Sequence, residues 1–452
     1  MYIRFTQTGN YLGIDFKAGE IKFITQYQRM IAAGYGVAVT EDDFAEYQAG
    51  INAPDIVDAG PSSTGATAKE IIASYNIAKD NNPHYNDVMP SPPTVTVPGA
   101  TITSGFTDYI ISDVTGLKNV AMNFYGGVLT GKLTYFAGFP VSTFISGGNF
   151  STTQNSLAWR VAFWTDAPLV DIGVYGGAGA YYYRIIVDGK YVSKTGVAPA
   201  GGGRQYIRVD FSSVVKPRLI QLEGYTANMF YSVGISPLYK IWKPAQAKKM
   251  IVVGDSFVEG TQATYPGDGL AFVAADYLGI ENCFMSGAGG TGYTNNGGAG
   301  KYTLIQRKND WILQSPDLLV FAAGINDADD AALQPAVLAL LQETRLALYN
   351  VPIIVLGVWG VGGPTAAIIS KENKIAAAVT QFADSKTVFI PISTDPLGAW
   401  VTGTGKVGAT TGVGNSDVVT STDGTHPSPY GHLYYGERIA TAIANALKTI
   451  SA

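Results

Sequence analysis

The chain has 452 residues, a formal net charge of −5 and one cysteine, Cys283. This length favours two or three domains, and an acidic balance without a basic run argues against nucleic acid as a partner. A lone cysteine excludes an intrachain disulfide, and with 3 histidines in the chain a cysteine or histidine metal site is not expected. No cofactor is expected either.

The composition favours an extracellular or virion-borne protein over a cytosolic enzyme. Charged residues make up 14% of the chain, against roughly 25% in soluble domains, while glycine (54) and tyrosine (27) are abundant. The N-terminal residues include Arg4 and Lys17 and lack an apolar core of about 7–15 residues, so no signal peptide is expected. The apolar run over residues 351–369 is interrupted by glycines and Pro364, so we expect neither a transmembrane helix nor a membrane partner.

The N-terminal part divides into two segments before the first large domain. Residues 1–60 are too short to bury much core of their own, and we consider two alternatives for them, an attachment or oligomerisation segment and a plain extension. Residues 61–94 are predicted as a linker because both ends are rich in glycine, proline and serine, with a short helical patch near residues 69–78. His84 is interpreted as a solvated histidine of this linker.

Residues 95–245 show the pattern of an all-β domain. Short apolar alternations recur between glycine-rich and polar turns, and Asp188-Gly189 indicates a hairpin because both residues accept positive φ. The absence of long helical patterns favours a sandwich or jelly roll, of the kind that binds carbohydrate. Strands are predicted over residues 159–164, 183–187 and 206–211.

Residues 246–452 change to alternating strands and helices, the pattern of a parallel sheet with helices on both faces. Strands are predicted over residues 251–253, 282–285, 318–321, 353–356 and 388–392. Helices are predicted over residues 270–278, 303–313, 334–349, 366–383 and 432–450.

Four polar motifs fall where ligands bind in such a sheet, beyond the carboxyl ends of the strands. Gly254-Asp255-Ser256 follows the first strand, a glycine-rich run over residues 286–293 follows the second, and Gly324-Ile325-Asn326-Asp327 follows the third. Asp423-Gly424-Thr425-His426 precedes the last helix. We therefore expect these motifs to form one site.

The residue types of this set fit nucleophilic catalysis on an ester. The hydroxyl of Ser256 is a weak nucleophile that needs a base, and His426 can accept its proton. Asp423, three residues earlier, can accept the other imidazole N–H and select the tautomer. The oxyanion of the tetrahedral intermediate needs preorganised donors, for which the N–H of Ser256, a glycine N–H after the second strand and the amide of Asn326 are candidates.

This set resembles that of the SGNH hydrolases, the GDSL-type esterases, over residues 249–452. The resemblance implies a flavodoxin-like hydrolase domain with Ser256 as nucleophile, His426 as base, Asp423 as its partner and Asn326 in the oxyanion hole. Asp255 is expected to support the turn, and the leucine usual after the serine is a phenylalanine here. The oxyanion glycine is either Gly290 or Gly287, and we favour the former.

Two aromatic residues and one histidine lie outside the predicted triad and oxyanion hole. Trp359 and Tyr293 lie in predicted loops at the same edge, where they either line an acyl or sugar pocket or simply pack. His432 begins the last predicted helix without a matching motif and is interpreted as structural.

A β-sandwich before the hydrolase domain is similar to the two-domain carbohydrate esterases of this superfamily, which implies removal of O-acetyl groups from a polysaccharide such as a bacterial capsule or O-antigen. The N-terminal segment and the composition resemble those of a phage tail fibre or spike, which implies a virion location and a homotrimer. Two alternatives stay open. One is a lipolytic esterase or thioesterase of the same family, and the other is a glycan-binding virion protein with a vestigial hydrolase domain.

Overall fold

The computed structural model describes residues 64–110, 121–127, 158–177, 182–225, 228–298, 301–360 and 362–451, together with short strands between these ranges and near the N-terminus. Within residues 2–39, three strands pair as an antiparallel sheet in the order β4-β1-β5, and two form the hairpin β2-β3. Their bounds are β1 (Tyr2–Phe5), β2 (Gly9–Tyr11), β3 (Ile14–Phe16), β4 (Ile21–Phe23) and β5 (Gly36–Val39). Among the described residues, no helix has the length and apolarity needed to cross a membrane.

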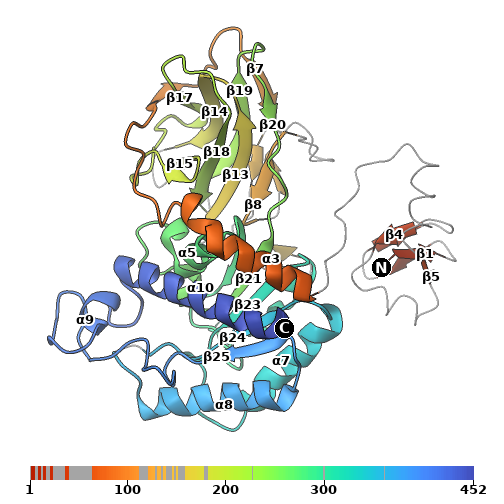
Figure 1. The fold of residues 1–452 in the computed structure, drawn as a ribbon, viewed down its shortest axis with the longest axis vertical. Coiled ribbons are helices and arrows are strands. Elements are labelled where there is room, and N and C mark those ends of the chain that lie inside the picture. The colour runs from red at the N-terminus through yellow and green to blue at the C-terminus, as the bar shows by residue number, and fades with distance from the viewer. Residues whose placement is uncertain are drawn as a thin grey trace.

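An all-β sandwich forms the upper half of the molecule in Figure 1. One antiparallel sheet has the order β6-β17-β14-β19-β10-β9 with β7 beside β19, and the other has the order β16-β15-β18-β13-β20 with β8 beside β13. The strands of the first sheet are β6 (Thr94–Gly99), β7 (Thr107–Ile110), β9 (Thr130–Leu133), β10 (Phe136–Gly138), β14 (Leu169–Gly176), β17 (Gly203–Asp210) and β19 (Met229–Ile235). Those of the second are β8 (Asn123–Tyr125), β13 (Ala158–Thr165), β15 (Arg184–Val187), β16 (Lys190–Tyr191), β18 (Arg218–Tyr225) and β20 (Ile241–Trp242). A separate hairpin pairs β11 (Ile145–Ser146) with β12 (Asn149–Phe150).

The sandwich core has the alternation that the sequence predicts. Val170, Ile172 and Val174 of β14 point inward with Ile207 and Val209 of β17 and are fully buried, because successive side chains of a strand face opposite sides of its sheet. The predicted hairpin turn is also confirmed, since φ is 49° at Asp188 and 74° at Gly189, both in the left-handed region that this turn requires.

The lower half is a five-stranded parallel sheet in the order β22-β21-β23-β24-β25. Numbered along the chain, this is the order 2-1-3-4-5 of flavodoxin-like folds, so the predicted fold class is confirmed. The strands are β21 (Lys249–Gly254), β22 (Asn282–Gly287), β23 (Leu318–Ala322), β24 (Ile353–Leu356) and β25 (Thr387–Ile390).

Helices cover both faces of this sheet. The helical elements are α3 (Thr64–Ile77), η1 (Ala78–Asp80), α4 (Ser256–Glu259), η2 (Pro266–Asp268), α5 (Leu270–Tyr277), η3 (Ile305–Arg307), α6 (Asn309–Ile312), α7 (Leu333–Ala347), α8 (Ala366–Phe382), α9 (Ser416–Val419) and α10 (Pro429–Ser451). One apolar cluster joins the sheet to α5 and α10, and the other joins it to α6, α7 and α8. Where a single helix is predicted over residues 303–313, the chain instead forms the two short helices η3 and α6.

Part of the predicted linker packs against the parallel-sheet domain. Helix α3 lies alongside α10 (Figure 1), its Ala68 and Ile71 are fully buried in the apolar cluster of α5 and α10, and the hydroxyl groups of Tyr75 and Thr441 lie 3.1 Å apart. The division of the chain at residues 61–94 and 245 stays a prediction, but α3 adds its apolar side to the core of the parallel-sheet domain.

A buried charge cluster connects the sandwich to the parallel-sheet domain. Arg160 of β13 donates two hydrogen bonds to Asp276 of α5, at 2.6 and 2.8 Å, and two more to Glu223 of β18. Arg184 of β15 donates to Glu223 on its other side at 2.6 and 2.8 Å. His84 also belongs here, with Nε2 at 3.1 Å from Oδ2 of Asp276 and a side chain that is 2% exposed. The interpretation of His84 as solvated was therefore wrong, because the segment before β6 runs across this interface.

Candidate active site

Ser256 lies at the end of β21, where the chain turns sharply into the single-turn helix α4. A Cβ at Gly254 would lie 2.2 Å from the carbonyl oxygen of Ala322, so only glycine lets the two strand ends approach this closely. Asp255 is fully buried, and its Oδ1 accepts a hydrogen bond from the N–H of Phe257 at 3.0 Å, which fixes the start of α4. Burial raises the pKa of Asp255 to about 7. Its contacts agree with the predicted supporting role at the turn.

Ser256, His426 and Asp423 form a continuous chain of hydrogen bonds. Oγ of Ser256 lies 2.8 Å from Nε2 of His426, and Nδ1 of the same ring lies 2.7 Å from Oδ2 of Asp423. An ionised carboxylate only accepts hydrogen bonds, so Nδ1 must carry the proton, and Nε2 is left to accept from the serine hydroxyl. The structure thus brings together the three residues that the sequence predicts for the triad.

Asp423 is held in its ionised form by several donors. Burial opposes ionisation, but hydrogen bonds from the imidazole and the backbone N–H of His426 and from the N–H of Thr425 hold the pKa of Asp423 well below its usual range. The amide of Gln262 donates a further hydrogen bond to Oδ2 at 3.2 Å. Gln262 has φ of 72°, an unusual value for a residue with a side chain.

The glycine-rich run forms a tight turn beside the serine. At the turn itself, the N–H groups of Ala288 and Thr291 donate to the carbonyl oxygens of Gly254 and Ala288, and the N–H of Gly289 donates to Oε2 of Glu259. The N–H of Gly290, which has φ of 80°, bonds no described residue. Gly287, the other candidate, ends β22 beneath α4, where a Cβ would lie 2.3 Å from the backbone nitrogen of Glu259. The geometry is therefore more favourable to Gly290 as an anion donor.

Asn326 follows β23 and faces the same turn. Its Nδ2 donates to the carbonyl oxygen of Thr291 at 3.0 Å, which uses one of the two protons on that nitrogen. The next residue, Asp327, accepts hydrogen bonds from the N–H groups of Tyr293, Thr294 and Asn295. The side chains of Asn326 and Asp327 therefore join the asparagine loop to the backbone of the glycine-rich loop.

Three residues that the sequence analysis did not single out support this edge. Arg307 is buried and donates to the carbonyl oxygens of Gly254 and Ser286 at 2.9 Å each, so it joins the ends of β21 and β22. Burial lowers the pKa of Arg307 to about 10. The other two residues are Glu259, which bonds Gly289, and Gln262, which bonds Asp423. Their position within six residues of Ser256 was a signal that the sequence offered, whereas Arg307 had none.

The expectation that Trp359 and Tyr293 line a pocket is not supported. Trp359 is fully buried and stacks on Phe257, with ring centroids 5.1 Å apart, and Tyr293 is 3% exposed in the core on the opposite face of the sheet. Both rings pack instead. His432 has the structural role predicted for it, since Nδ1 accepts from the N–H of Leu270 and Nε2 lies 2.9 Å from the carbonyl oxygen of Thr261.

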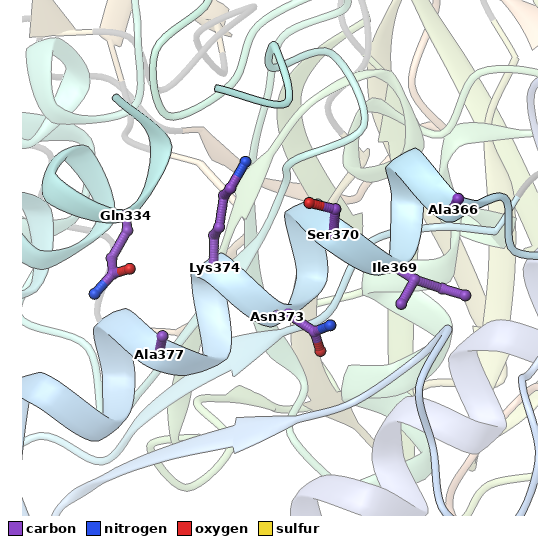
Figure 2. A pocket seen from close by; sticks show the side chains of 7 residues that line it. All are labelled: Gln334, Ala366, Ile369, Ser370, Asn373, Lys374 and Ala377. Carbon is purple, nitrogen blue, oxygen red and sulfur yellow. The ribbon is translucent and has the colours of Figure 1, made fainter. Parts of the chain in front are cut away.

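A surface hollow of about 470 Å³ lies against α7 and α8 (Figure 2). None of the predicted site residues lines it. Its lining consists of Gln334, Ala366, Ile369, Ser370, Asn373, Lys374 and Ala377. In the described part of the chain, no group of three histidine, cysteine, aspartate or glutamate side chains is placed to hold a metal ion.

Comparisons with known proteins agree with this site. Residues 252–433 match the model of the GDSL-like lipase/acylhydrolase family, a range that includes the serine, glycine, asparagine and histidine motifs. No curated protein matched the sequence.

Solved structures match over most of the chain at low sequence identity. A salicylyl-acyltransferase from a tetracycline biosynthetic pathway is 14% identical with a TM-score of 0.56, covering 76% of this chain and 98% of its own. A family two carbohydrate esterase from Cellvibrio japonicus is 10% identical with a TM-score of 0.52, covering 79% and 99%. An acetyl xylan esterase from Butyrivibrio proteoclasticus is 13% identical with a TM-score of 0.51, covering 76% and 100%.

These likenesses cover the sandwich as well as the hydrolase domain and show a shared two-domain fold. The family match covers the segment that carries the motifs. Residues 252–433 therefore form a GDSL-like lipase/acylhydrolase domain, which makes this chain a carboxylic ester hydrolase.

Proposed function

We propose that this chain removes O-acetyl groups from a polysaccharide through an acyl-enzyme on Ser256. The observation that carries the proposal is the hydrogen-bonded chain from Ser256 through His426 to Asp423. The side chains of His426 and Asp423 are 19% and 31% exposed, so an ester on a bulky polymer can reach them. Two solved structures with the same two-domain fold, an acetyl xylan esterase and a family two carbohydrate esterase, support the choice of substrate class.

The reaction proceeds in two halves with His426 moving one proton in each. In the first, Nε2 of His426 takes the hydroxyl proton while Oγ of Ser256 bonds the acetyl carbonyl carbon, and the resulting oxyanion is stabilised by donors of the edge. The intermediate collapses by breaking the bond to the sugar oxygen, which leaves with the proton from His426. The ionised Asp423 stabilises the imidazolium in between.

Water completes the cycle. His426 removes a proton from a water molecule as its oxygen bonds the acetyl carbon of the acyl-enzyme, and collapse of the second tetrahedral intermediate releases acetic acid and returns the proton to Ser256. For the oxyanion we propose three donors, the N–H groups of Ser256 and Gly290 and the second amide proton of Asn326.

Acetate release from a panel of acetylated bacterial polysaccharides tests the proposal. Wild type should release acetate from at least one polymer, and Ser256→Ala should release none above background. Nitrophenyl esters of increasing chain length separate the lipolytic alternative, since a preference for long acyl chains over acetate would contradict the proposal. Equal release by wild type and Ser256→Ala would instead favour the glycan-binding alternative with a vestigial hydrolase domain.

The location and oligomeric state of the enzyme are a further part of the proposal. The low charge and high glycine and tyrosine content support an extracellular or virion-borne protein, with residues 1–60 as an attachment segment and three copies per assembly. Light scattering of the full chain measures this directly, because a trimer has three times the chain mass of 47.7 kDa. A monomer at micromolar concentration would contradict this part alone.

A further inference from the structure

Glu259 and Lys301 hold the two backbone groups of Gly289 from opposite ends. The N–H of Gly289 donates to Oε2 of Glu259 at 2.8 Å, and the carbonyl oxygen of Gly289 accepts from Nζ of Lys301 at 2.5 Å. Both side chains are partly buried. A single residue of a surface turn is thus fixed by two charged groups, and charge-assisted hydrogen bonds of this kind are stronger than neutral ones.

The position of Glu259 follows from that of the nucleophile. Ser256 and Glu259 are the first and last residues of α4, three apart, and such residues are neighbours on a helix surface. A Cβ added at Gly289 would lie 3.6 Å from Cβ of Ser256 and 2.9 Å from Oε2 of Glu259. The carboxylate therefore spans from the nucleophile's own helix to the glycine turn, and any other residue at position 289 would crowd it.

Holding the carbonyl of Gly289 also orients the next N–H. The carbonyl of Gly289 and the N–H of Gly290 belong to one planar trans peptide, in which the two groups point in opposite directions. With φ of 80° at Gly290, this peptide has conformational freedom that most residues lack. The bond from Lys301 removes that freedom and leaves the N–H of Gly290 directed away from the ammonium group.

We propose that Glu259 and Lys301 are positioning residues that aim the N–H of Gly290 at the oxyanion by fixing Gly289 on both sides. The inference rests on the proposed acyl-enzyme at Ser256. Burial raises the pKa of Glu259, while the N–H of Gly289 and the charge of Lys301 oppose that rise, in keeping with a carboxylate placed inside the site. In the opposite role, Glu259 competes with the oxyanion for the N–H of Gly289. Removing the carboxylate would then raise kcat instead of lowering it.

Steady-state hydrolysis of p-nitrophenyl acetate by the full chain distinguishes the two roles. Glu259→Ala should lower kcat on the order of 10–100-fold, somewhat less than loss of an oxyanion donor itself, with KM changed less than about threefold because the contact matters in the transition state. Glu259→Gln should keep most of the activity, since its amide oxygen can still accept from Gly289. An increase in kcat for Glu259→Ala, or equal losses for both variants, would overturn the proposal.

Variants of Lys301 test the same proposal if Glu259→Ala does not fold. Lys301→Met should lower kcat in the same way, and Lys301→Arg should restore it, with thermal unfolding followed for each variant. Unchanged kcat in folded Lys301→Met would also overturn the proposal. The matched control is Glu343→Ala, which removes an exposed acid paired with Lys308 at 3.0 Å and should leave kcat within about twofold, since exposed ion pairs of this kind contribute little.

Failure of this inference and failure of the proposed function give different results. If Ser256→Ala is inactive on p-nitrophenyl acetate and Glu259→Ala keeps full activity, only the positioning role is wrong. If Ser256→Ala keeps wild-type activity on the same ester, the acyl-enzyme itself is wrong.

Discussion

Two charged clusters in this chain use similar side chains in opposite ways. At the domain interface, Arg160, Arg184 and Glu223 are at most 1% exposed, and both oxygens of Glu223 accept from an arginine. At the edge of the parallel sheet, His426 and Asp423 are 19% and 31% exposed. The interface cluster is closed to solvent, whereas the proposed catalytic cluster is open to it.

The difference in hydrogen bonding matters as much as the difference in exposure. Tyr191 and Tyr225 add hydroxyl donors to Glu223 at 3.2 Å each, so the interface carboxylate has four side-chain donors. At the catalytic edge, the N–H of Gly290 bonds no described residue, which leaves a donor available to a reacting group. A saturated cluster holds two domains in one orientation, and a partly satisfied one can stabilise a charge that exists only during the reaction.

The largest expected effect separates catalysis from stability. His426→Ala removes the base from the open cluster, and kcat/KM for p-nitrophenyl acetate should fall by roughly 10⁴–10⁶-fold, as in hydrolases that depend on such a triad. The midpoint of thermal unfolding should hardly change, because His426 is partly exposed and its side chain hydrogen-bonds only Ser256 and Asp423 among the described residues. A variant that retains a tenth of wild-type activity would remove His426 from the proposed mechanism.

The interface cluster should show the reverse behaviour. Glu223→Ala leaves Arg160 and Arg184 buried with fewer partners, and removing one member of a buried ion pair costs about 3–5 kcal/mol. We therefore expect a loss of this size in the free energy of unfolding, measured by chemical denaturation, while kcat of the folded fraction changes little.

An exposed ion pair supplies the control for Glu223→Ala. Glu343→Ala breaks the pair with Lys308, whose side chains are 43% and 42% exposed, and should cost at most about 1 kcal/mol. Equal destabilisation by the two variants would show that the interface cluster does not stabilise the chain through its burial. Loss of kcat in folded Glu223→Ala would show that the interface also controls the catalytic edge.

Substitution of Asn326 tests the proposed side-chain donor to the oxyanion. Asn326→Ala removes a proposed oxyanion donor and should lower kcat on the order of 10²–10³-fold with little change in KM. Asn296→Ala is the matched control, because this exposed amide in the neighbouring loop bonds only the N–H of Gly298 among the described residues. A loss below about fivefold in Asn326→Ala would leave the oxyanion to backbone donors alone.

The sequence predicts best the features whose signals are local. The strands of the parallel sheet are short apolar runs, and each catalytic motif follows a strand or precedes a helix, so the positions of Ser256, Asn326 and His426 could be placed at one edge. The Asp188-Gly189 turn was predictable for the same reason, because the requirement for positive φ acts on those two residues alone.

What could not be predicted depends on contacts between distant segments. Gln262 and Asp423 are 161 residues apart, and His84 meets Asp276 only because the segment before β6 crosses the domain interface. Trp359 follows a strand in the sequence but stacks on Phe257 in the core. No local pattern distinguishes a loop aromatic that lines a pocket from one that packs beneath it.

His432 gives the smallest expected effect and separates a buried histidine from the catalytic one. Burial lowers the pKa of His432 from 6.5 to about 4, so at a pH between these values the unfolded chain binds a proton that the folded chain does not. Stability from this group is therefore complete above pH 6.5 and is lost as pH falls toward about 4, by about 3 kcal/mol at most. Asp255, whose pKa rises from 3.8 to about 7, acts in the opposite direction over much of this window.

Comparison with a variant isolates the contribution of His432 from that of Asp255. His432→Gln retains a donor and an acceptor for Thr261 and Leu270 but does not titrate, while Asp255 is the same in both proteins. The difference in unfolding free energy, wild type minus His432→Gln, should therefore decrease steadily between pH 7 and pH 4 when measured by chemical denaturation. A difference that stays constant would mean that His432 is not held neutral in the folded chain, and one that grows would mean that the protonated form is the one stabilised.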